Sequence, residues 1–305
     1  MQSPLRYPGS KSDFIQTAIR IIEDNDLAGL PLVEPYAGSA AVTLGLLNAK
    51  VIKHATLVER DPLVYSFWKC VFERTDDLVS AFSELPITME TWHNFHTLRS
   101  INAPSSKSKQ QLQLGLACLF FNRANFSGIL NAGPIGGKEQ KSQYKIDCRT
   151  NKQEIISRIQ KIAEFSGKVD VEFGDAIEVI DRYRNRKKVF FYIDPPYFLK
   201  GESLYRYAYK LKEHKLLAQA LTKTKFPWVL SYDVHHVIEF LYEDFHIKKC
   251  NFQYSARSPK NHEELVVSNF EIKQLATDIK NQKASGPKIF TGLKNSNENR
   301  IGVEI

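Results

Sequence analysis

The residues with the clearest chemical potential are Asp194, Pro195, Pro196 and Tyr197, which follow an apolar run at 189–193. An unbroken run of β-branched and aromatic residues predicts a strand that is buried on both faces. Because proline cannot donate to a strand ladder, the chain must leave the sheet directly after Asp194. We expect a carboxylate, unclaimed carbonyls and a flat ring where open α/β sheets bind ligands. These groups suit a planar ligand with an amino group, although an isolated Asp-Pro-Pro more often only ends a strand.

Two earlier strand-like segments, 31–34 and 55–59, also end in acidic residues. Small residues at 37–41 follow the first segment and allow a ligand to approach the backbone closely. Glu59 ends the second, about twenty positions further on, where an acid typically binds the ribose hydroxyls of a nucleoside. The three-glycine dinucleotide fingerprint is missing, so a nucleoside that carries an amino acid fits better than one that carries a pyrophosphate. Each loop alone is equally typical of an ordinary strand-to-helix turn.

The elements that must position these loops alternate between strands and helices along most of the chain. Further strands are expected at 169–175, 189–193 and 228–233, followed by a hairpin of strands near 245–254 and 264–270 at the sheet edge. Lys11 precedes the first helical pattern, where it can meet a carboxylate or a phosphate. Residues 200–207 are predicted to form a mobile flap. The alternation predicts an α/β fold.

The composition is that of a soluble globular protein, with 305 residues of which 43% are hydrophobic and 25% charged. No apolar run approaches the ~20 residues that cross a bilayer, and the N-terminus has no secretory segment. The four cysteines are scattered and show no paired ligand spacing. A reduced cytoplasmic protein without a structural metal site is therefore expected.

The positive charge is concentrated in one segment, where the alternation of strands and helices stops. The formal net charge is +8, and residues 99–161 hold eleven Lys or Arg against three Asp or Glu. A solvated basic face would explain this excess, but we favour a surface that binds a phosphate backbone. Helical spacing around Trp92 and a buried helix at 112–121 predict a mostly helical insertion, with an irregular loop at 131–138.

Seven short segments, taken in order, resemble motifs of the Dam-like (alpha-group, DPPY-motif) adenine-specific DNA methyltransferases. They are residues 5–11, 34–39, 59–61, 121–123, 174–175, 194–197 and 231–233. The resemblance implies an α/β, Rossmann-like S-adenosylmethionine-dependent methyltransferase fold with an inserted, mostly helical target-recognition domain between the second and third strands. It divides the chain into a discontinuous catalytic domain at 1–74 and 166–275, a DNA target-recognition insertion at 75–165, and a polar C-terminal tail at 276–305.

The resemblance also assigns site residues by position. Contacts with the cofactor S-adenosyl-L-methionine are implied for Tyr7, Lys11, Glu34, Pro35, Ala37, Gly38, Ser39, Glu59, Asp175 and Asp194. Among these, Lys11 would bind the methionine carboxylate, Glu59 the ribose and Asp175 the adenine amino group. Catalysis is implied for Asp194, Pro195, Pro196 and Tyr197, and DNA binding is expected from Arg123, Asn125, Lys138, Lys141, Lys145 and Arg149. No metal is implied.

Three parts of the chain depart from the family pattern, and the first is Tyr36, which stands where phenylalanine is common. Glu59 replaces the aspartate usual there, which keeps the charge and shifts its position. The loop at 133–137 differs from the GATC-modifying members, so the resemblance assigns no recognition sequence.

The implied function is the site-specific transfer of a methyl group to the exocyclic amino group of an adenine flipped out of duplex DNA. Asp194 and the Pro195 carbonyl would accept the hydrogens of that amino group, while Tyr197 stacks on the base. RNA methylation, protein-amide methylation and a non-catalytic DNA-binding regulator are the alternatives. Double-stranded DNA is the expected partner, in bacterial cytoplasm at the nucleoid, encoded by the bacterium or a phage, and no membrane is involved. A cognate restriction endonuclease is expected, if at all, as a genetic neighbour and not in a stable complex.

Overall fold

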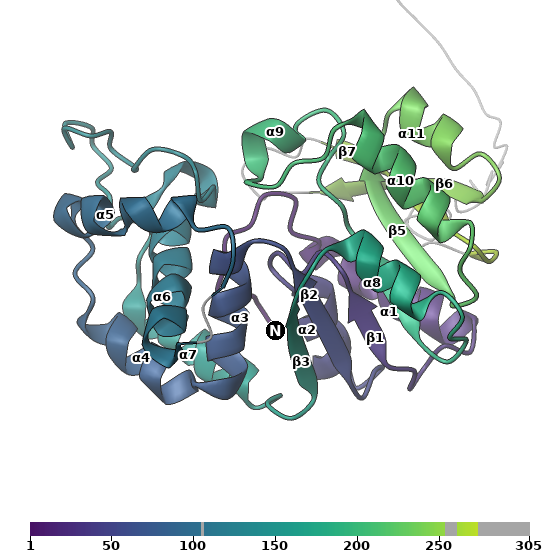
Figure 1. The fold of residues 1–305 in the computed structure, drawn as a ribbon, viewed down its shortest axis with the longest axis horizontal. Coiled ribbons are helices and arrows are strands. Elements are labelled where there is room, and N and C mark those ends of the chain that lie inside the picture. The colour runs from purple at the N-terminus through teal and green to yellow at the C-terminus, as the bar shows by residue number, and fades with distance from the viewer. Residues whose placement is uncertain (105–106, 254–260, 274–305) are drawn as a thin grey trace, which may run out of the picture.

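A computed structural model describes residues 1–104, 107–253 and 261–273, and its seven strands form one sheet in the order β3-β2-β1-β4-β5-β7-β6 (Figure 1). The strands are β1 (Leu32–Glu34), β2 (Ala55–Glu59), β3 (Val169–Phe173), β4 (Phe190–Ile193), β5 (Trp228–Asp233), β6 (His246–Gln253) and β7 (Asn261–Ser268). Strands β1 to β5 pair in parallel, and β7 pairs antiparallel with both β5 and β6. The α/β fold and the hairpin predicted at the sheet edge are confirmed.

Strand β4 is the central strand, and its four residues are all buried. Successive side chains of a strand point to opposite faces, so Phe190 and Tyr192 join one hydrophobic core while Phe191 and Ile193 join the other. Helices therefore cover both faces of the sheet, which explains the unbroken apolar run in the sequence. The strand order reverses between β1 and β4, and this switch point is where such sheets bind ligands.

The helices that cover the sheet come from both halves of the chain. They are α1 (Ile15–Asp24), α2 (Ala41–Asn48) and α3 (Pro62–Glu73) on one face, and α8 (Ala176–Tyr183), α10 (Leu211–Leu221) and α11 (His236–Leu241) on the other. The short helices η1 (Ser12–Phe14) and α9 (Gly201–Leu204) lie in loops. Helix α9 falls within the predicted flap at 200–207, whose mobility stays a prediction.

The segment between α3 and β3 is helical, as the sequence predicts. It contains α4 (Thr75–Glu84), α5 (Met89–His96), η2 (Thr97–Ser100), α6 (Ser108–Ala124), η3 (Phe126–Gly128) and α7 (Lys152–Ala163). Figure 1 shows α4 to α7 grouped beside α3, at one side of the sheet. Helix α6 approaches α3 closely at Gly115, where an added Cβ would lie 3.0 Å from the Ser66 carbonyl oxygen. The hydrophobic core of the sheet thus continues through α3 into this segment.

The C-terminal tail expected at 276–305 lies outside the described residues. Among the residues that are described, no helix combines the length and the apolar character needed to cross a membrane.

Candidate active site

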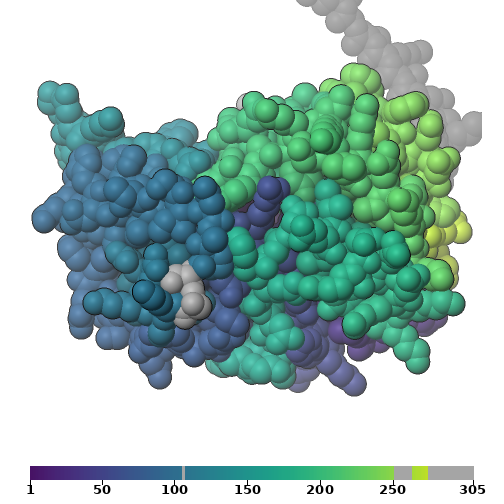
Figure 2. Space-filling model, in the orientation of Figure 1, coloured from purple at the N-terminus to yellow at the C-terminus, as the bar shows by residue number. Residues whose placement is uncertain are grey.

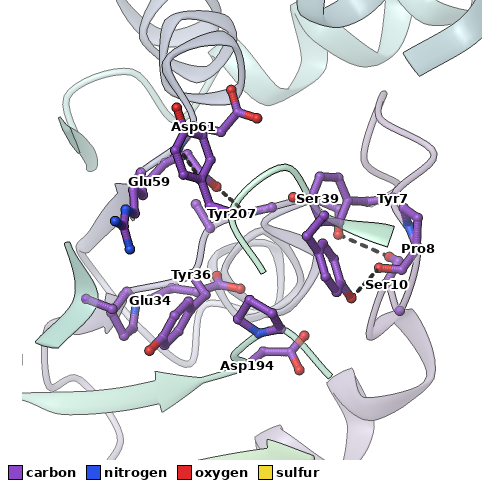
Figure 3. Close-up of a pocket in the computed structure, with 18 of the residues that line it drawn as sticks. Tyr7, Pro8, Ser10, Glu34, Tyr36, Ser39, Glu59, Asp61, Asp194 and Tyr207 are labelled. Carbon is purple, nitrogen blue, oxygen red and sulfur yellow. Dashed lines mark hydrogen bonds between the residues drawn. The ribbon is translucent and has the colours of Figure 1, made fainter. Parts of the chain in front are cut away.

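The ends of β1, β2 and β4 border a cleft with an empty volume of about 790 Å³, part of which is open to solvent. Figure 2 shows a hollow between the blue and green parts of the chain. The residues predicted to bind a cofactor all line this cleft: Tyr7, Lys11, Glu34, Pro35, Ala37, Gly38, Ser39, Glu59, Asp175 and Asp194. In Figure 3, Glu59 and Asp61 lie on one side of the cleft, Tyr7 and Ser10 on another, and Asp194 on a third. The fold therefore brings together segments that are far apart in sequence.

Asp194 follows the last residue of β4 and is held through one oxygen. Its Oδ1 accepts hydrogen bonds from Lys11 Nζ and from Ser231 Oγ, each at 2.8 Å. Burial raises the pKa of Asp194, and the Lys11 ammonium opposes that shift. Among the described residues no hydrogen bond is made to Oδ2, so this oxygen can accept a hydrogen from a ligand.

The rest of the Asp194 loop is fixed by neighbouring strands. Pro196 lines the cleft, whereas Pro195 is buried and does not line it. The Tyr197 hydroxyl donates to Glu264 Oε1 at 2.9 Å and accepts from Lys11 Nζ at 3.1 Å. The Asp233 carboxylate, at the end of β5, accepts from the backbone amides of Phe198 and Leu199. The sequence assigned no role to Ser231, Asp233 or Glu264, because their contacts are visible only once the strands are side by side.

The loop after β1 approaches the opposite wall of the cleft at Gly38. Its φ of +43° is in the left-handed region, and an added Cβ would lie 2.9 Å from Cε1 of Tyr7. The Gly38 amide donates to Glu59 Oε2 at 3.1 Å, and its carbonyl accepts from Trp68 Nε1 at 2.9 Å. Glu59 Oε1 accepts from the Asp61 amide at 2.8 Å, and burial raises the pKa of Glu59 to about 7. Glu59 therefore orders two loops that line the cleft.

The other two acidic strand ends also have partners within the protein. Glu34 accepts a hydrogen bond from the Thr43 hydroxyl, and burial raises its pKa to about 8. Asp175 accepts from the Ile177 amide at 2.9 Å and so caps α8, while its second oxygen lies 3.2 Å from Arg60 Nη1. These hydrogen bonds explain in part why an acidic residue stands at each of the two positions.

Residues 205–209 form a further wall of the cleft that the sequence analysis missed. Tyr205, Arg206, Tyr207 and Tyr209 line the cleft. The Tyr205 hydroxyl donates to the Pro8 carbonyl at 3.2 Å, and the hydroxyls of Tyr209 and Tyr36 are 3.0 Å apart. The alternating tyrosines at 205, 207 and 209 are the only signal in the sequence that could have indicated this wall.

The comparison with protein families shows which family the chain belongs to. Residues 7–256 match the family model of the D12 class N6 adenine-specific DNA methyltransferases. The chain belongs to this family. The resemblance predicted from the seven motif segments is therefore confirmed, and the protein is an S-adenosylmethionine-dependent methyltransferase.

Solved structures resemble the methyltransferase only at low identity. The Thermoplasma acidophilum 1320 protein is 9% identical with a TM-score of 0.39, covering 90% of this chain and 91% of that one. Precorrin-6y C5,15-methyltransferase from Geobacter metallireducens is 9% identical with a TM-score of 0.34, covering 84% and 87%. The m1A22 tRNA methyltransferase of B. subtilis is 11% identical with a TM-score of 0.33, covering 83% and 65%. No curated protein matches the sequence significantly.

Two of the six DNA-binding candidates of the methyltransferase lie in its interior. Arg123 is 8% exposed, and its guanidinium donates to the Pro4 carbonyl. Asn125 is fully buried, accepts from Trp92 Nε1 at 2.9 Å, and donates to the carbonyls of Ile129 and Leu130. Both side chains fix the chain around the end of α6 and neither is presented at the surface of this structure, and their contact with DNA stays a prediction.

The remaining four candidates are exposed on the loop between η3 and α7. They are Lys138, Lys141, Lys145 and Arg149. Lys141 pairs with Glu139, and the Lys145 ammonium donates to the Gln140 carbonyl. These contacts leave all four cations at the surface, where they can meet a partner.

Asn122 is a structural residue that the sequence analysis noted only as part of a motif. Its amide oxygen accepts from the Arg6 amide at 2.7 Å, and its amide nitrogen donates to the carbonyls of Arg6 and Gly128. Asn122 therefore attaches the N-terminal segment, next to Tyr7, to the insertion of the methyltransferase.

Proposed function

We propose that this methyltransferase transfers the methyl group of S-adenosylmethionine to the exocyclic amino group of an adenine flipped out of duplex DNA. The observation that carries the proposal is how the two oxygens of the Asp194 carboxylate are bonded in the cleft. Lys11 and Ser231 hold its Oδ1, which leaves Oδ2 as an acceptor beside the loop at Gly38. The family membership supports adenine as the base.

The residues of the cleft fit S-adenosylmethionine, which carries a sulfonium and an ammonium group. Five acidic side chains line the cleft, of which Glu34 holds its proton at neutral pH because burial raises its pKa to about 8: Glu34, Glu59, Asp61, Asp175 and Asp194. Among the described residues of the lining, Lys11, Arg60 and Arg206 bring positive charge. At Gly38 the left-handed backbone packs against the Tyr7 ring, and an added Cβ would lie 2.9 Å from that ring, so the loop meets the cleft without a side chain. Ala37, Gly38 and Ser39 would lie under the methionine part, Glu59 at the ribose and Asp175 at the adenine.

When bound, S-adenosylmethionine supplies an electrophilic methyl group on its sulfonium. The exocyclic nitrogen of adenine is a poor nucleophile, because its lone pair is delocalised into the ring. Asp194 and the Pro195 carbonyl would accept the two amino hydrogens and so direct the lone pair out of the ring plane. Lys11 and Ser231 keep the Asp194 carboxylate in one orientation for this purpose.

The chain outside the cleft would bind the DNA. An adenine inside a duplex cannot reach Asp194, so the base must leave the stack, and Tyr197 would stack on it and offset part of the unstacking cost of a few kcal/mol. The exposed cations at 138–149 would contact the phosphate backbone. In this proposal residues 75–165 form the target-recognition domain, and residues 1–74 and 166–275 form the catalytic domain.

The proposal is tested by a methyl-transfer assay that offers several acceptors at once. The protein is incubated with tritiated S-adenosylmethionine and equal masses of unmethylated duplex DNA, RNA and a protein mixture. We expect label in DNA, and N6-methyladenosine after digestion to deoxynucleosides. Asp194→Ala should abolish transfer and leave DNA binding, measured by fluorescence anisotropy, within about threefold of wild type.

Each other result contradicts a defined part of the proposal. Label in RNA or in protein would mean that RNA or protein, and not DNA, is the substrate. Retained turnover of Asp194→Ala would reject the role of this carboxylate. Failure of calorimetry to detect S-adenosylmethionine binding would favour a non-catalytic DNA-binding protein. Methylation-sensitive sequencing of DNA from an expressing, methylase-free host would then identify the recognition sequence.

A further inference from the structure

A second buried carboxylate, Glu264, contacts the groups that hold Asp194. Glu264 lies on β7 and is 3% exposed. Its Oε1 accepts the Tyr197 hydroxyl at 2.9 Å and lies 3.6 Å from Lys11 Nζ. Since Lys11 Nζ is 2.8 Å from Asp194 Oδ1, one ammonium serves two carboxylates that come from β4 and β7.

The strand itself does not require a carboxylate at this position. The residues that follow Glu264 on β7, namely Leu265, Val266 and Val267, are fully buried and apolar. A buried ion pair is often no more stabilising than apolar residues of similar volume, so an acid here is not explained by strand stability. It contacts Tyr197, which belongs to the Asp194 loop, and Lys11, which touches Asp194.

We infer that Glu264 is a positioning residue for methyl transfer, which orients the Tyr197 ring and shares the Lys11 ammonium with Asp194. This inference rests on the proposed function. The Tyr197 hydroxyl has one acceptor in Glu264 and one donor in Lys11. The hydroxyl oxygen lies on the axis about which the ring turns, so the two bonds fix where that axis ends and hold the ring in one position within the Asp194 loop, where it can stack on a base.

The shared ammonium has an electrostatic consequence for Asp194. Because Lys11 also contacts Glu264, it offsets less of the Asp194 charge, and Asp194 is a stronger acceptor for the amino hydrogens of a substrate. Burial is the main cause that raises the pKa of Asp194, Lys11 lowers it, and Glu264 raises it again. The other titratable groups that act on Asp194 are Glu34, Tyr192, Tyr197, Tyr205 and Tyr232. Burial raises the pKa of each of these phenols, so the tyrosines stay neutral.

The test compares Glu264→Gln with wild type and with Glu263→Gln, which changes the exposed neighbour on the same strand. Glutamine keeps the size and an acceptor oxygen but loses the charge. We expect kcat to fall at least tenfold in Glu264→Gln, with the KM values for S-adenosylmethionine and DNA within about twofold. The acid limb of the kcat–pH profile should move to lower pH, since the Glu264 charge that raises the pKa of Asp194 is then gone. Glu263→Gln should match wild type in all three measurements.

Tyr197→Phe separates the two parts of the role. It removes the hydroxyl bond and keeps the ring, so it should lower kcat, and combining it with Glu264→Gln should cost less than the product of the two single losses. A Glu264→Gln enzyme within twofold of wild type overturns the inference. So does a loss of kcat with an unmoved acid limb, which would indicate a purely structural role.

A measurement without substrate keeps this inference separate from the proposed function. The 13Cγ resonance of Asp194, assigned with Asp194→Asn, can be titrated in wild type and in Glu264→Gln. We expect its midpoint at lower pH in the variant, and an unchanged midpoint overturns the electrostatic part. If wild type methylates no DNA, the proposed function fails, whereas this titration still decides whether Glu264 acts on Asp194.

Discussion

Arg206 and Asp61 form a buried ion pair, with Arg206 Nη1 2.6 Å from Asp61 Oδ1 and side chains that are 6% and 7% exposed. The second guanidinium nitrogen donates to the carbonyls of Arg99 and Ile101 in the insertion. Asp61 also accepts from the Leu63 amide and so caps α3. One guanidinium thus joins the 205–209 wall, the end of β2 and the insertion.

Replacing Arg206 with alanine should therefore affect both stability and the cleft. The change leaves the Asp61 carboxylate buried without its cation, which typically costs about 3–5 kcal/mol of unfolding free energy. The 205–209 segment would also lose its attachment, so the KM for S-adenosylmethionine should rise about tenfold. Urea denaturation and initial-rate kinetics measure the two effects.

The exposed pair of Arg182 and Glu172 provides a matched control for this variant. Its nitrogen and oxygen are 2.7 Å apart, but the side chains are 50% and 33% exposed. Arg182→Ala should cost less than about 1 kcal/mol, because water screens such pairs. Equal losses from Arg206→Ala and Arg182→Ala would contradict the importance of the buried pair.

Gly38→Ala should weaken cofactor binding without changing any charge. The φ of +43° is unfavourable for alanine, and its Cβ would lie 2.9 Å from the Tyr7 ring. Either the loop or the Tyr7 ring must move, and both line the cleft. Calorimetry should show the Kd for S-adenosylmethionine rising at least tenfold. Gly133→Ala is the control, since nothing lies within 4 Å of its added Cβ, and it should bind like wild type.

The positions of the strand ends could be predicted from the sequence, because local residue patterns determine where each strand stops. The prolines after Asp194 and the small residues around Gly38 act on the adjacent backbone, so their effect is visible without the fold. All ten predicted cofactor residues consequently line one cleft. Which of them bind a cofactor stays a prediction.

The contacts of Glu264, Ser231 and Arg206 could not be predicted, because they depend on which strands and loops become neighbours. The burial of Arg123 was not predicted for a different reason. The sequence predicts a buried helix at 112–121, and α6 stays buried to residue 124, so a cation in its last turn is enclosed by packing. A basic segment therefore does not place every one of its cations at the surface.

The raised pKa of Glu34 predicts how the free energy of unfolding depends on pH. Its folded pKa of about 8 is above the ordinary value of 4.5, so between these values the folded state holds a proton that the unfolded state releases. The contribution of Glu34 to the free energy of unfolding is therefore most favourable at low pH. It falls as the pH rises towards 8, by up to about 1.4 kcal/mol per pH unit.

Glu34→Gln should remove that dependence, since glutamine stays neutral and can still accept from the Thr43 hydroxyl. Urea denaturation at pH 5, 6, 7 and 8 should show the variant gaining stability over wild type as pH increases. Glu59, with a pKa of about 7, contributes to both proteins and does not create this difference. If the free energies of unfolding of the two proteins changed in parallel with pH, the raised pKa of Glu34 would be contradicted.

The exposed cations at 138–149 predict the salt dependence of DNA binding. Lys138 and Arg149 are both exposed, and each phosphate contact contributes about 0.9 to the slope of log Kd against log salt. The double variant Lys138→Ala/Arg149→Ala should therefore bind duplex DNA at least tenfold more weakly at 100 mM salt, with the slope reduced by up to about 2. Lys187→Ala/Lys188→Ala removes the same charge at the opposite, amino end of β4, and this control should keep wild-type affinity and slope. Fluorescence anisotropy between 50 and 200 mM salt distinguishes the two, and equal losses in both double variants would mean that net charge, and not this loop, binds the backbone.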